Sequence, residues 1–323
     1  MPNFKLPLLT TLLVLTACFN NFALGPDSSP KAGFSLPDSI SEVTLHYKRA
    51  NNLIVLPVTI NDSVHVNLIL DTGCRNVVLF GKRFLKELNI HPDKRVEFSG
   101  LGSGRSVAGR ISLGNKVAID AVLGERIPVV VVPNPNLFGN YYGVDGIIGY
   151  DIFIKFEIEL HASQQLITFR PALTAQLSDD YNLIPIRVED SRPIIQSTII
   201  YKGTEQLLDL MIDTGSSLGL LLKTNKGYEP RGQSTVLGRG LNGPIEGIKV
   251  RADGLRLNKF LLTKVPAGVV QSAWSGNPSI GMDILGGYSM VLNYCKGYAG
   301  LKRDTPTLAG GFKRSKEPEE VDF

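Results

Sequence analysis

The chain has 323 residues, of which 43% are hydrophobic. Its 34 basic and 30 acidic residues give a formal net charge of +4, and because the basic residues are scattered, the sequence predicts no nucleic-acid partner, which would need a basic stripe. Short runs of Val, Ile and Leu alternate with many of the 33 glycines and 19 prolines, with almost no long amphipathic stretch. This pattern predicts a β-rich fold.

The first residues predict a lipoprotein signal peptide. Lys5 precedes an apolar run over residues 6–17, which is too short to span a bilayer and is typical of a signal-peptide core. The run ends in Leu-Thr-Ala-Cys, which resembles a bacterial lipobox with Cys18 as the lipidated residue. An ordinary signal peptide with an accidental cysteine is the alternative. We expect residues 1–17 to be removed and Cys18 to anchor the protein in the cell envelope; Asn20 favours the outer membrane, facing the periplasm.

Composition divides the remaining chain into segments. Residues 18–40 are rich in Pro, Ser and Gly and predict a flexible tether. Residues 303–323 are charged, contain Pro and Gly and have no apolar face, so we expect a disordered tail. Between them we expect an N-terminal lobe over 41–177, a connector over 178–190 and a C-terminal lobe over 191–302, which is enough chain for two lobes of typical domain size.

One tripeptide, Asp-Thr-Gly, occurs twice: Asp71-Thr72-Gly73 and Asp213-Thr214-Gly215. Each copy directly follows an apolar run, over 66–70 and 207–212, and each is followed by another, which predicts a strand, a sharp glycine turn and a second strand. A single copy is explained by turn-forming residues alone. Because a carboxylate behind a buried strand is costly, two copies in the same context indicate that the two carboxylates meet for chemistry.

Further motifs repeat downstream of each tripeptide. The pattern Ile-Gly-x-Asp-Ile-apolar begins at Ile148 and again at Ile280, followed by the alternation of a strand. The copies are 142 residues apart at the tripeptide and 132 apart at this pattern, so the first copy carries about ten extra residues, a length that surface loops accept. A glycine-rich stretch lies between the motifs in each copy and predicts a mobile hairpin tip. Its candidate flap glycines are Gly100, Gly102 and Gly104 in the first copy and Gly238, Gly240 and Gly243 in the second.

Together these motifs resemble those of the aspartic proteases, the clan of pepsin and retropepsin. Each half is similar to a bacterial retropepsin-like domain, and the resemblance covers residues 50–302 as two such domains in tandem. It implies an all-β, two-lobed, acid-protease-like barrel with pseudo-two-fold symmetry. The amphipathic stretch over 81–88 predicts a helix in the first half, and we expect one short helix per lobe.

The resemblance implies that Asp71 and Asp213 form a catalytic dyad. Two carboxylates about 3 Å apart at an effective dielectric constant near 20 repel by about 5 kcal/mol when both are ionised, so they share one proton. The ionised member then removes a proton from a water while the protonated member polarises the scissile carbonyl. Thr72 and Thr214 would cross-bond beneath the dyad, and the glycines of both tripeptides, Gly73 and Gly215, would let the backbone approach the carboxylates.

The residues after the two tripeptides differ. Ser216 offers a hydroxyl to Asp213, whereas Cys74 offers Asp71 only a weak donor, so we expect Asp71 to be the more readily protonated member. We interpret Cys74 as a buried small side chain. A disulfide to Cys295 is an open alternative in an oxidising compartment, because the sequence does not give their separation.

Other candidate sites are weaker. A G-x-S-x-G pattern over 215–219 lacks the alternating strands and helices of its fold. The four histidines show no spacing typical of metal ligands, so we expect neither a metal nor a cofactor. We assign turn and capping roles to the acidic residues beside the Ile-Gly segments, and Trp274 either lines a subsite or packs. These acidic residues and the histidines are Asp145, Asp151, Asp283, His46, His65, His91 and His161.

We therefore expect an aspartic endopeptidase that acts on peptide or protein substrates in the cell envelope. The alternative is a catalytically silent, lipid-anchored protein that binds extended peptides in the same cleft between the lobes. The long offset between the copies and the Pro-containing connector favour a monomer with an intrachain active site over a dimer in which halves of two chains pair.

Overall fold

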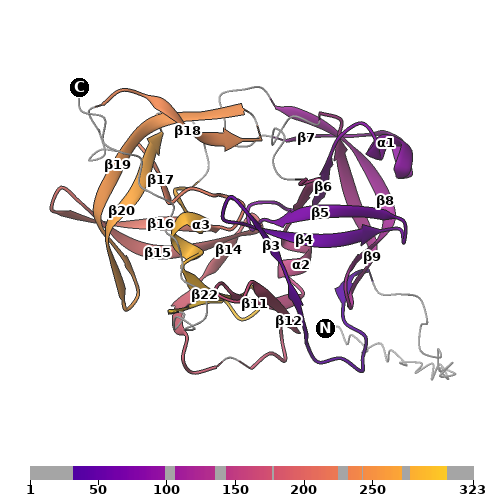
Figure 1. The fold of residues 1–323 in the computed structure, drawn as a ribbon, viewed down its shortest axis with the longest axis horizontal. Helices are drawn as coiled ribbons and strands as arrows, with labels where there is room; N and C mark the ends of the chain where they lie inside the picture. The colour runs from indigo at the N-terminus through magenta and orange to yellow at the C-terminus, as the bar shows by residue number, and fades with distance from the viewer. Residues whose placement is uncertain are drawn as a thin grey trace, which may run out of the picture. The chain divides into compact units, whose positions relative to one another are not determined.

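A computed structural model describes residues 32–98, 106–134, 143–176, 178–224, 232–241, 243–270 and 277–303. Over these residues the chain forms 23 strands and three four-residue helices (Figure 1), which confirms the all-β prediction. None of these helices is long and apolar enough to cross a membrane. The predicted signal peptide and Cys18, the tail after residue 303, Trp274 and the first set of flap glycines (Gly100, Gly102 and Gly104) lie outside the described residues.

The first lobe is a nine-stranded sheet that closes where β8 pairs with β9. It also carries two helices, α1 (Phe84–Glu87) and α2 (Tyr150–Phe153). The strand β3 (Lys48–Ala50) pairs with β4 beside the main path. In sheet order the other strands are β1 (Gly33–Ser35), β9 (Val122–Val132), β6 (Val77–Phe80), β10 (Gly146–Ile148), β5 (Val64–Leu70), β4 (Leu53–Ile60), β8 (Val107–Ile119) and β7 (Ile90–Phe98).

The second lobe repeats this architecture in an eight-stranded sheet, which closes where β15 pairs with β19. Its helix α3 (Met282–Leu285) corresponds to α2, because each begins directly after an Ile-Gly pair. In sheet order its strands are β14 (Arg187–Glu189), β15 (Arg192–Tyr201), β16 (Thr204–Asp213), β21 (Ser279–Gly281), β17 (Leu220–Lys223), β20 (Phe260–Val270), β19 (Gly243–Leu257) and β18 (Thr235–Gly240).

A third sheet takes strands from both halves of the chain. The two halves meet where β11 runs antiparallel to β22, with Ile158 opposite Leu292 and Leu160 opposite Met290. These residues are equivalent in the two sequence copies, so the pairing places the pseudo-two-fold axis between them. In sheet order the six strands are β13 (Asn182–Pro185), β23 (Tyr298–Arg303), β22 (Tyr288–Asn293), β11 (Phe156–His161), β12 (Leu166–Pro171) and β2 (Val43–His46).

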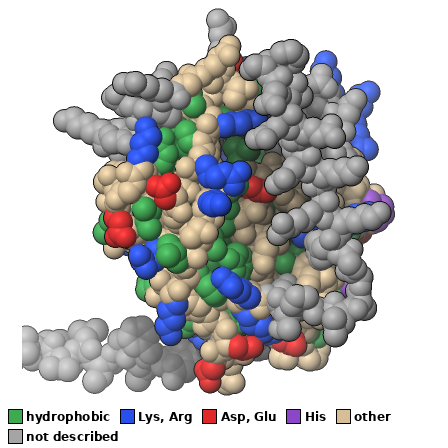
Figure 2. Space-filling view, turned by 60° about the vertical axis from the view of Figure 1, so that its left-hand side comes forward, with side chains coloured by type: hydrophobic (Ala, Val, Ile, Leu, Met, Phe, Trp, Pro, Cys, Tyr) green, Lys and Arg blue, Asp and Glu red, His purple; other side chains and the backbone are tan. Residues whose placement is uncertain are grey.

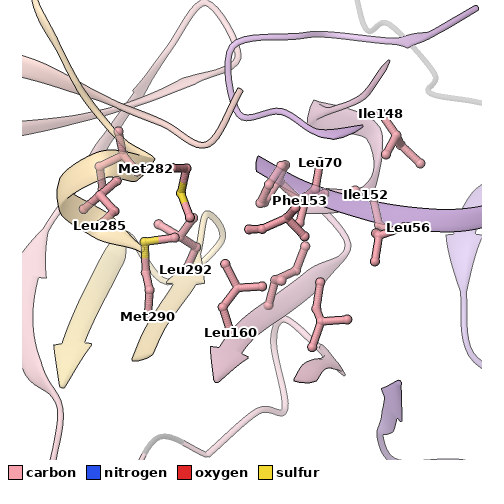
Figure 3. Close-up of a cluster of buried hydrophobic side chains, with 14 of the residues drawn as sticks. Leu56, Leu70, Ile148, Ile152, Phe153, Leu160, Met282, Leu285, Met290 and Leu292 are labelled. Atoms are coloured by element: carbon pink, nitrogen blue, oxygen red, sulfur yellow. The ribbon is translucent and has the colours of Figure 1, made fainter. Parts of the chain in front are cut away.

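The main core is continuous between the two halves. In β5 every second residue from Val64 to Leu70 enters it, as the two-residue period of a strand requires. Figure 3 shows Leu70 and Phe153 near Leu292 and Met282 of the second half, and all four belong to one cluster of buried side chains. Burial of this size is the dominant stabilising contribution to such a fold. The two tripeptides therefore rest on one shared apolar base.

Three details differ from the sequence predictions. The range 18–40, predicted as a tether, contains β1, because Phe34 is buried where Gly124 leaves no Cβ in its way. The range 178–190, predicted as a connector, contains β13 and β14, which pair with strands of the shared sheet and the second lobe. The first lobe has two short helices where one was predicted, and the second lobe has the expected one.

Candidate active site

Each Asp-Thr-Gly tripeptide lies at the carboxyl end of a central strand that is paired in parallel with the strand of the second motif. In the first lobe Leu70 lies opposite Ile148, and the Asp71 N–H donates to the Ile148 carbonyl at 2.8 Å. In the second lobe Asp213 lies opposite Gly281. Because parallel neighbours end at the same edge of a sheet, the repeated Ile-Gly segment directly supports the carboxylate-bearing turn in both lobes.

The glycines of the second motif are required by close backbone packing. A Cβ on Gly149 would lie 1.8 Å from the Cys74 carbonyl oxygen, and one on Gly281 would lie 2.3 Å from the Leu218 carbonyl oxygen. No side chain fits at either position, because each glycine packs directly against the backbone of the loop that follows the tripeptide of its lobe.

Two threonines join the tripeptides beneath the carboxylates. The Thr72 N–H donates to Thr214 Oγ1 at 3.1 Å, and the Thr214 N–H donates to Thr72 Oγ1 at 3.0 Å. Each hydroxyl then donates across the pseudo-two-fold axis, Thr72 to the Ile212 carbonyl at 2.6 Å and Thr214 to the Leu70 carbonyl at 2.7 Å. Both threonines are fully buried, so these four bonds hold the two loops in fixed register, the arrangement that the family resemblance implies.

The two carboxyl groups meet at the tripeptide glycines. Asp71 Oδ1 accepts the Gly73 N–H at 2.7 Å, and Asp213 Oδ1 accepts the Gly215 N–H at 3.1 Å. A Cβ on Gly215 would lie 2.4 Å from the Asp71 Cγ atom. The Asp71 carboxyl therefore packs directly against the glycine that hydrogen-bonds the Asp213 carboxyl, and the close approach depends on the absence of a side chain there.

Burial raises the pKa of both carboxyls, Asp71 and Asp213. Desolvation is the largest cause for each, and the negative charge of Asp71 raises the pKa of Asp213 further, to about 7. Backbone N–H groups and the positive charge of Arg192 act in the opposite direction on both pKa values. Both shifts favour protonation, as two neighbouring buried carboxyls that share a proton require.

The predicted asymmetry of the dyad rested on different side-chain donors to the two carboxyls. The Cys74 thiol donates to the Asn76 carbonyl at 3.2 Å, and the Ser216 hydroxyl accepts the Leu218 N–H at 3.3 Å. Among the described contacts, neither side chain hydrogen-bonds a dyad carboxyl, so the donor difference on which the prediction rested is absent. Cys74 and Cys295 are both free thiols, not a disulfide; Cys74 is half-buried instead of fully buried, and desolvation raises the pKa of its thiol.

The second flap candidate is a hairpin of β18 and β19. Its last pairs are Arg239 with Pro244 and Gly240 with Gly243, and Gly243 has a φ of +108°, which favours glycine. A Cβ on Gly238 would lie 3.6 Å from the Leu218 side chain, so this end of the hairpin passes over the loop that follows Asp213.

The hairpin tip also touches the first lobe. Leu241 packs against a cluster that we call the Asp71-side cluster. This cluster contains Ile69, which lies two residues before Asp71 and so shares its face of the sheet. The tip of the second-lobe hairpin thus contacts the wall of the first lobe on the Asp71 side. The Asp71-side cluster comprises Val55, Ile69, Val78, Phe80, Val130, Val132 and Ile147.

The other acidic candidates have structural positions. Asp145 accepts the Asn67 N–H at 2.9 Å and forms an ion pair with Arg83 at 2.6 Å. Asp151 and Asp283 lie in the first turns of α2 and α3, and burial raises the pKa of Asp151.

Neither competing catalytic motif forms a site. In the G-x-S-x-G pattern the central Ser217 hydroxyl accepts a hydrogen bond from the Asn51 side-chain amide at 3.1 Å. In the described part of the chain, no group of three or more His, Cys, Asp or Glu side chains is arranged to hold a metal ion.

Two residues near the dyad were missed at the sequence level. Arg192 lowers the pKa of both dyad carboxyls, and only the pairing of β15 with β16 brings it beside Asp213. Tyr294 stacks on Phe153 with ring centroids 5.2 Å apart, and burial, followed by the negative charges of the dyad carboxyls, raises its pKa. No sequence signal indicates its position.

Comparison with known proteins agrees with this geometry. Residues 56–152 match an aspartyl protease family. The aspartyl protease match contains Asp71 and the Ile148-Gly149 pair but not the second tripeptide. No curated protein matches the chain. Among solved structures, the aspartic proteinase from Irpex lacteus is similar with a TM-score of 0.55 and 14% sequence identity, over 83% of this chain and 99% of that chain. The chain therefore has the aspartic proteinase fold.

Proposed function

We propose that the protein is an aspartic endopeptidase in which Asp71 and Asp213 share one proton and activate a water molecule. One observation carries the proposal: the two copies of one motif bring their carboxyls together at Gly215. The hydrogen-bonded pair Thr72 and Thr214 joins the same two loops. The aspartyl protease match over the first copy and the aspartic proteinase fold support it.

We infer the roles within the dyad from the surroundings of the two carboxyls. Asp71 holds the shorter backbone hydrogen bond, at 2.7 Å, and acts as the ionised member, whereas Asp213 carries the proton. Asp71 removes a proton from water while Asp213 donates a hydrogen bond to the scissile carbonyl oxygen, and the hydroxide adds to the carbon. The proton on Asp71 then passes to the departing amide nitrogen as the C–N bond breaks. No covalent enzyme intermediate forms.

The substrate would be an extended peptide or protein segment between the lobes, covered by the β18–β19 hairpin. One chain supplies both carboxylates, so we propose a monomer with an intrachain site and no cofactor. We further propose that a lipid on Cys18 tethers the enzyme to the outer membrane, facing the periplasm, so that cell-envelope proteins are its substrates.

Cleavage of a mixed peptide library tests the proposal. The purified chain is incubated with the library from pH 3 to 8, beside Asp71→Asn, Asp213→Asn and the control Asp62→Asn, which changes an exposed turn residue with a φ of +61° that Asn tolerates. Wild type and control should cut, and both dyad variants should lose activity. Peptide binding without cleavage at any pH would overturn the proposal and support a catalytically silent peptide-binding protein.

A further inference from the structure

The two walls beside the dyad differ in charge. In the first lobe Val55 lies opposite Ile69, and the same antiparallel register continued by two residues places Leu53 opposite Asp71. In the second lobe Ile194 lies opposite Met211, and the same step places Arg192 opposite Asp213. Residues opposite each other on neighbouring strands point to the same face. The position beside Asp71 is therefore apolar, and its pseudo-symmetric equivalent beside Asp213 carries a guanidinium.

Arg192 belongs to a cluster of three charged residues at the junction of the lobes. Asp190, in the turn between β14 and β15, pairs with Arg75 of the first lobe at 2.5 Å and with Arg192 at 3.5 Å. Arg75 follows the first tripeptide by two residues. Two guanidiniums thus share one carboxylate, and the cluster keeps a net charge of +1 beside the dyad.

Among the described residues, Asp190 does not occupy all the N–H donors of the Arg192 guanidinium. A guanidinium offers five N–H donors, and among the described residues Asp190 is the one carboxylate within ion-pair distance of Arg192, at the longer 3.5 Å. The Arg192 side chain is 41% exposed. Its charge also lowers the pKa of both dyad carboxyls, in agreement with a position facing the cleft.

The equivalent position in the first lobe, Leu53, has apolar neighbours. Leu53 packs against the Asp71-side cluster, as does the hairpin residue Leu241. Figure 2 shows basic side chains spread among hydrophobic and acidic ones over the pictured face instead of one basic stripe. A local cationic position beside Asp213 is therefore the feature that distinguishes the second wall from the first.

We propose that Arg192 is a specificity-determining residue that binds an acidic side chain of the peptide substrate on the Asp213 side of the cleft, while the Asp71 side takes an apolar residue. This inference rests on the proposed peptidase function and adds the substrate class. A carboxylate would take the free N–H donors of Arg192, with Arg75 adding charge behind it, and charge-assisted hydrogen bonds of this kind are stronger than neutral ones. A Gln at the same substrate position is isosteric but lacks the charge.

Paired peptides test the assignment. A peptide from the cleavage library is made in versions with Glu or Gln at each position on either side of the cut. We expect one position at which Glu raises kcat/KM by about 10-fold over Gln. Arg192→Met should abolish that preference, and Arg192→Lys should retain part of it. The control is Arg251→Met, in which Arg251 lies on the β19–β20 pair and bonds the Lys264 carbonyl, and this variant should keep the whole preference. The preference should weaken as salt rises from 0.05 to 0.5 M.

The outcomes separate this inference from the proposed function. Cleavage without any Glu preference, or a preference unchanged in Arg192→Met, overturns the inference and leaves the peptidase function intact. If no peptide is cut, the peptidase function fails, and the same Glu and Gln peptides, labelled with a fluorophore, are titrated into wild type and Arg192→Met. Tighter Glu binding by wild type alone still supports the anion site, and equal binding overturns it.

Discussion

Replacing Thr214 by Val tests whether the cross-bonded threonines hold the lobes together. Val has nearly the same shape but no hydroxyl, so the Thr72 N–H loses its acceptor at 3.1 Å and the Leu70 carbonyl loses its donor at 2.7 Å. A buried N–H without a partner costs about 1–3 kcal/mol and a lost hydrogen bond about 1 kcal/mol. The expected loss is about 2–4 kcal/mol, a large part of the 5–15 kcal/mol typical of a folded protein.

Thr214→Ser provides the matched control, because it keeps the hydroxyl and removes only a buried methyl group, at about 1 kcal/mol. Urea unfolding followed by circular dichroism measures the free energy of unfolding of all three proteins. Thr214→Val should be clearly less stable than Thr214→Ser. Equal stability of the two variants would refute the reasoning, because the hydroxyl would then contribute nothing to the junction.

Three further predictions concern the dyad. Because the pKa of Asp213 is raised to about 7, its contribution to stability is full below about pH 4 and is lost as pH rises towards 7. The free energy of unfolding should therefore fall over that range, and it should fall less in Asp213→Asn. A flat profile for wild type would contradict the raised pKa. Gly215→Ala places a methyl group 2.4 Å from the Asp71 Cγ atom and should reduce kcat/KM by about 100-fold or more. Circular dichroism should show that the fold is retained. Unchanged kinetics would mean that the Asp71 carboxyl has room to move. Cys74→Ser should leave the pH dependence of activity unchanged, because the thiol bonds the Asn76 carbonyl and not Asp71; a shift of the optimum would restore the asymmetry predicted from the sequence.

The duplicated motifs predicted the symmetric part of the structure. The resemblance that rests on the two tripeptides implied two similar lobes, with Thr72 and Thr214 bonded to each other across the axis. Alternation also identified β11 and β22 as strands. It did not show that Ile158 pairs with Leu292 in a sheet shared by both halves, because an alternating pattern predicts a strand without naming its partner.

The asymmetric features could not be predicted. The roles of Cys74 and Ser216 depend on which neighbouring backbone group each side chain meets, and residue type does not determine this. Phe34 lies in a segment whose composition predicts a tether, yet one buried ring over Gly124 is enough to order a strand there. Arg192 lies far from either tripeptide in the sequence and becomes part of the site only through the register of β15 and β16.

The pH dependence of cleavage of a single peptide tests the central claim most directly. One peptide cut from the library is assayed from pH 3 to 8 with wild type, Asp62→Asn, Asp71→Asn and Asp213→Asn. Wild type and Asp62→Asn should give the same bell-shaped profile, with activity declining as Asp213 loses its proton near pH 7. Both dyad variants should lose at least about a thousand-fold in kcat/KM. A dyad variant that cuts at the wild-type rate would contradict a shared-proton mechanism.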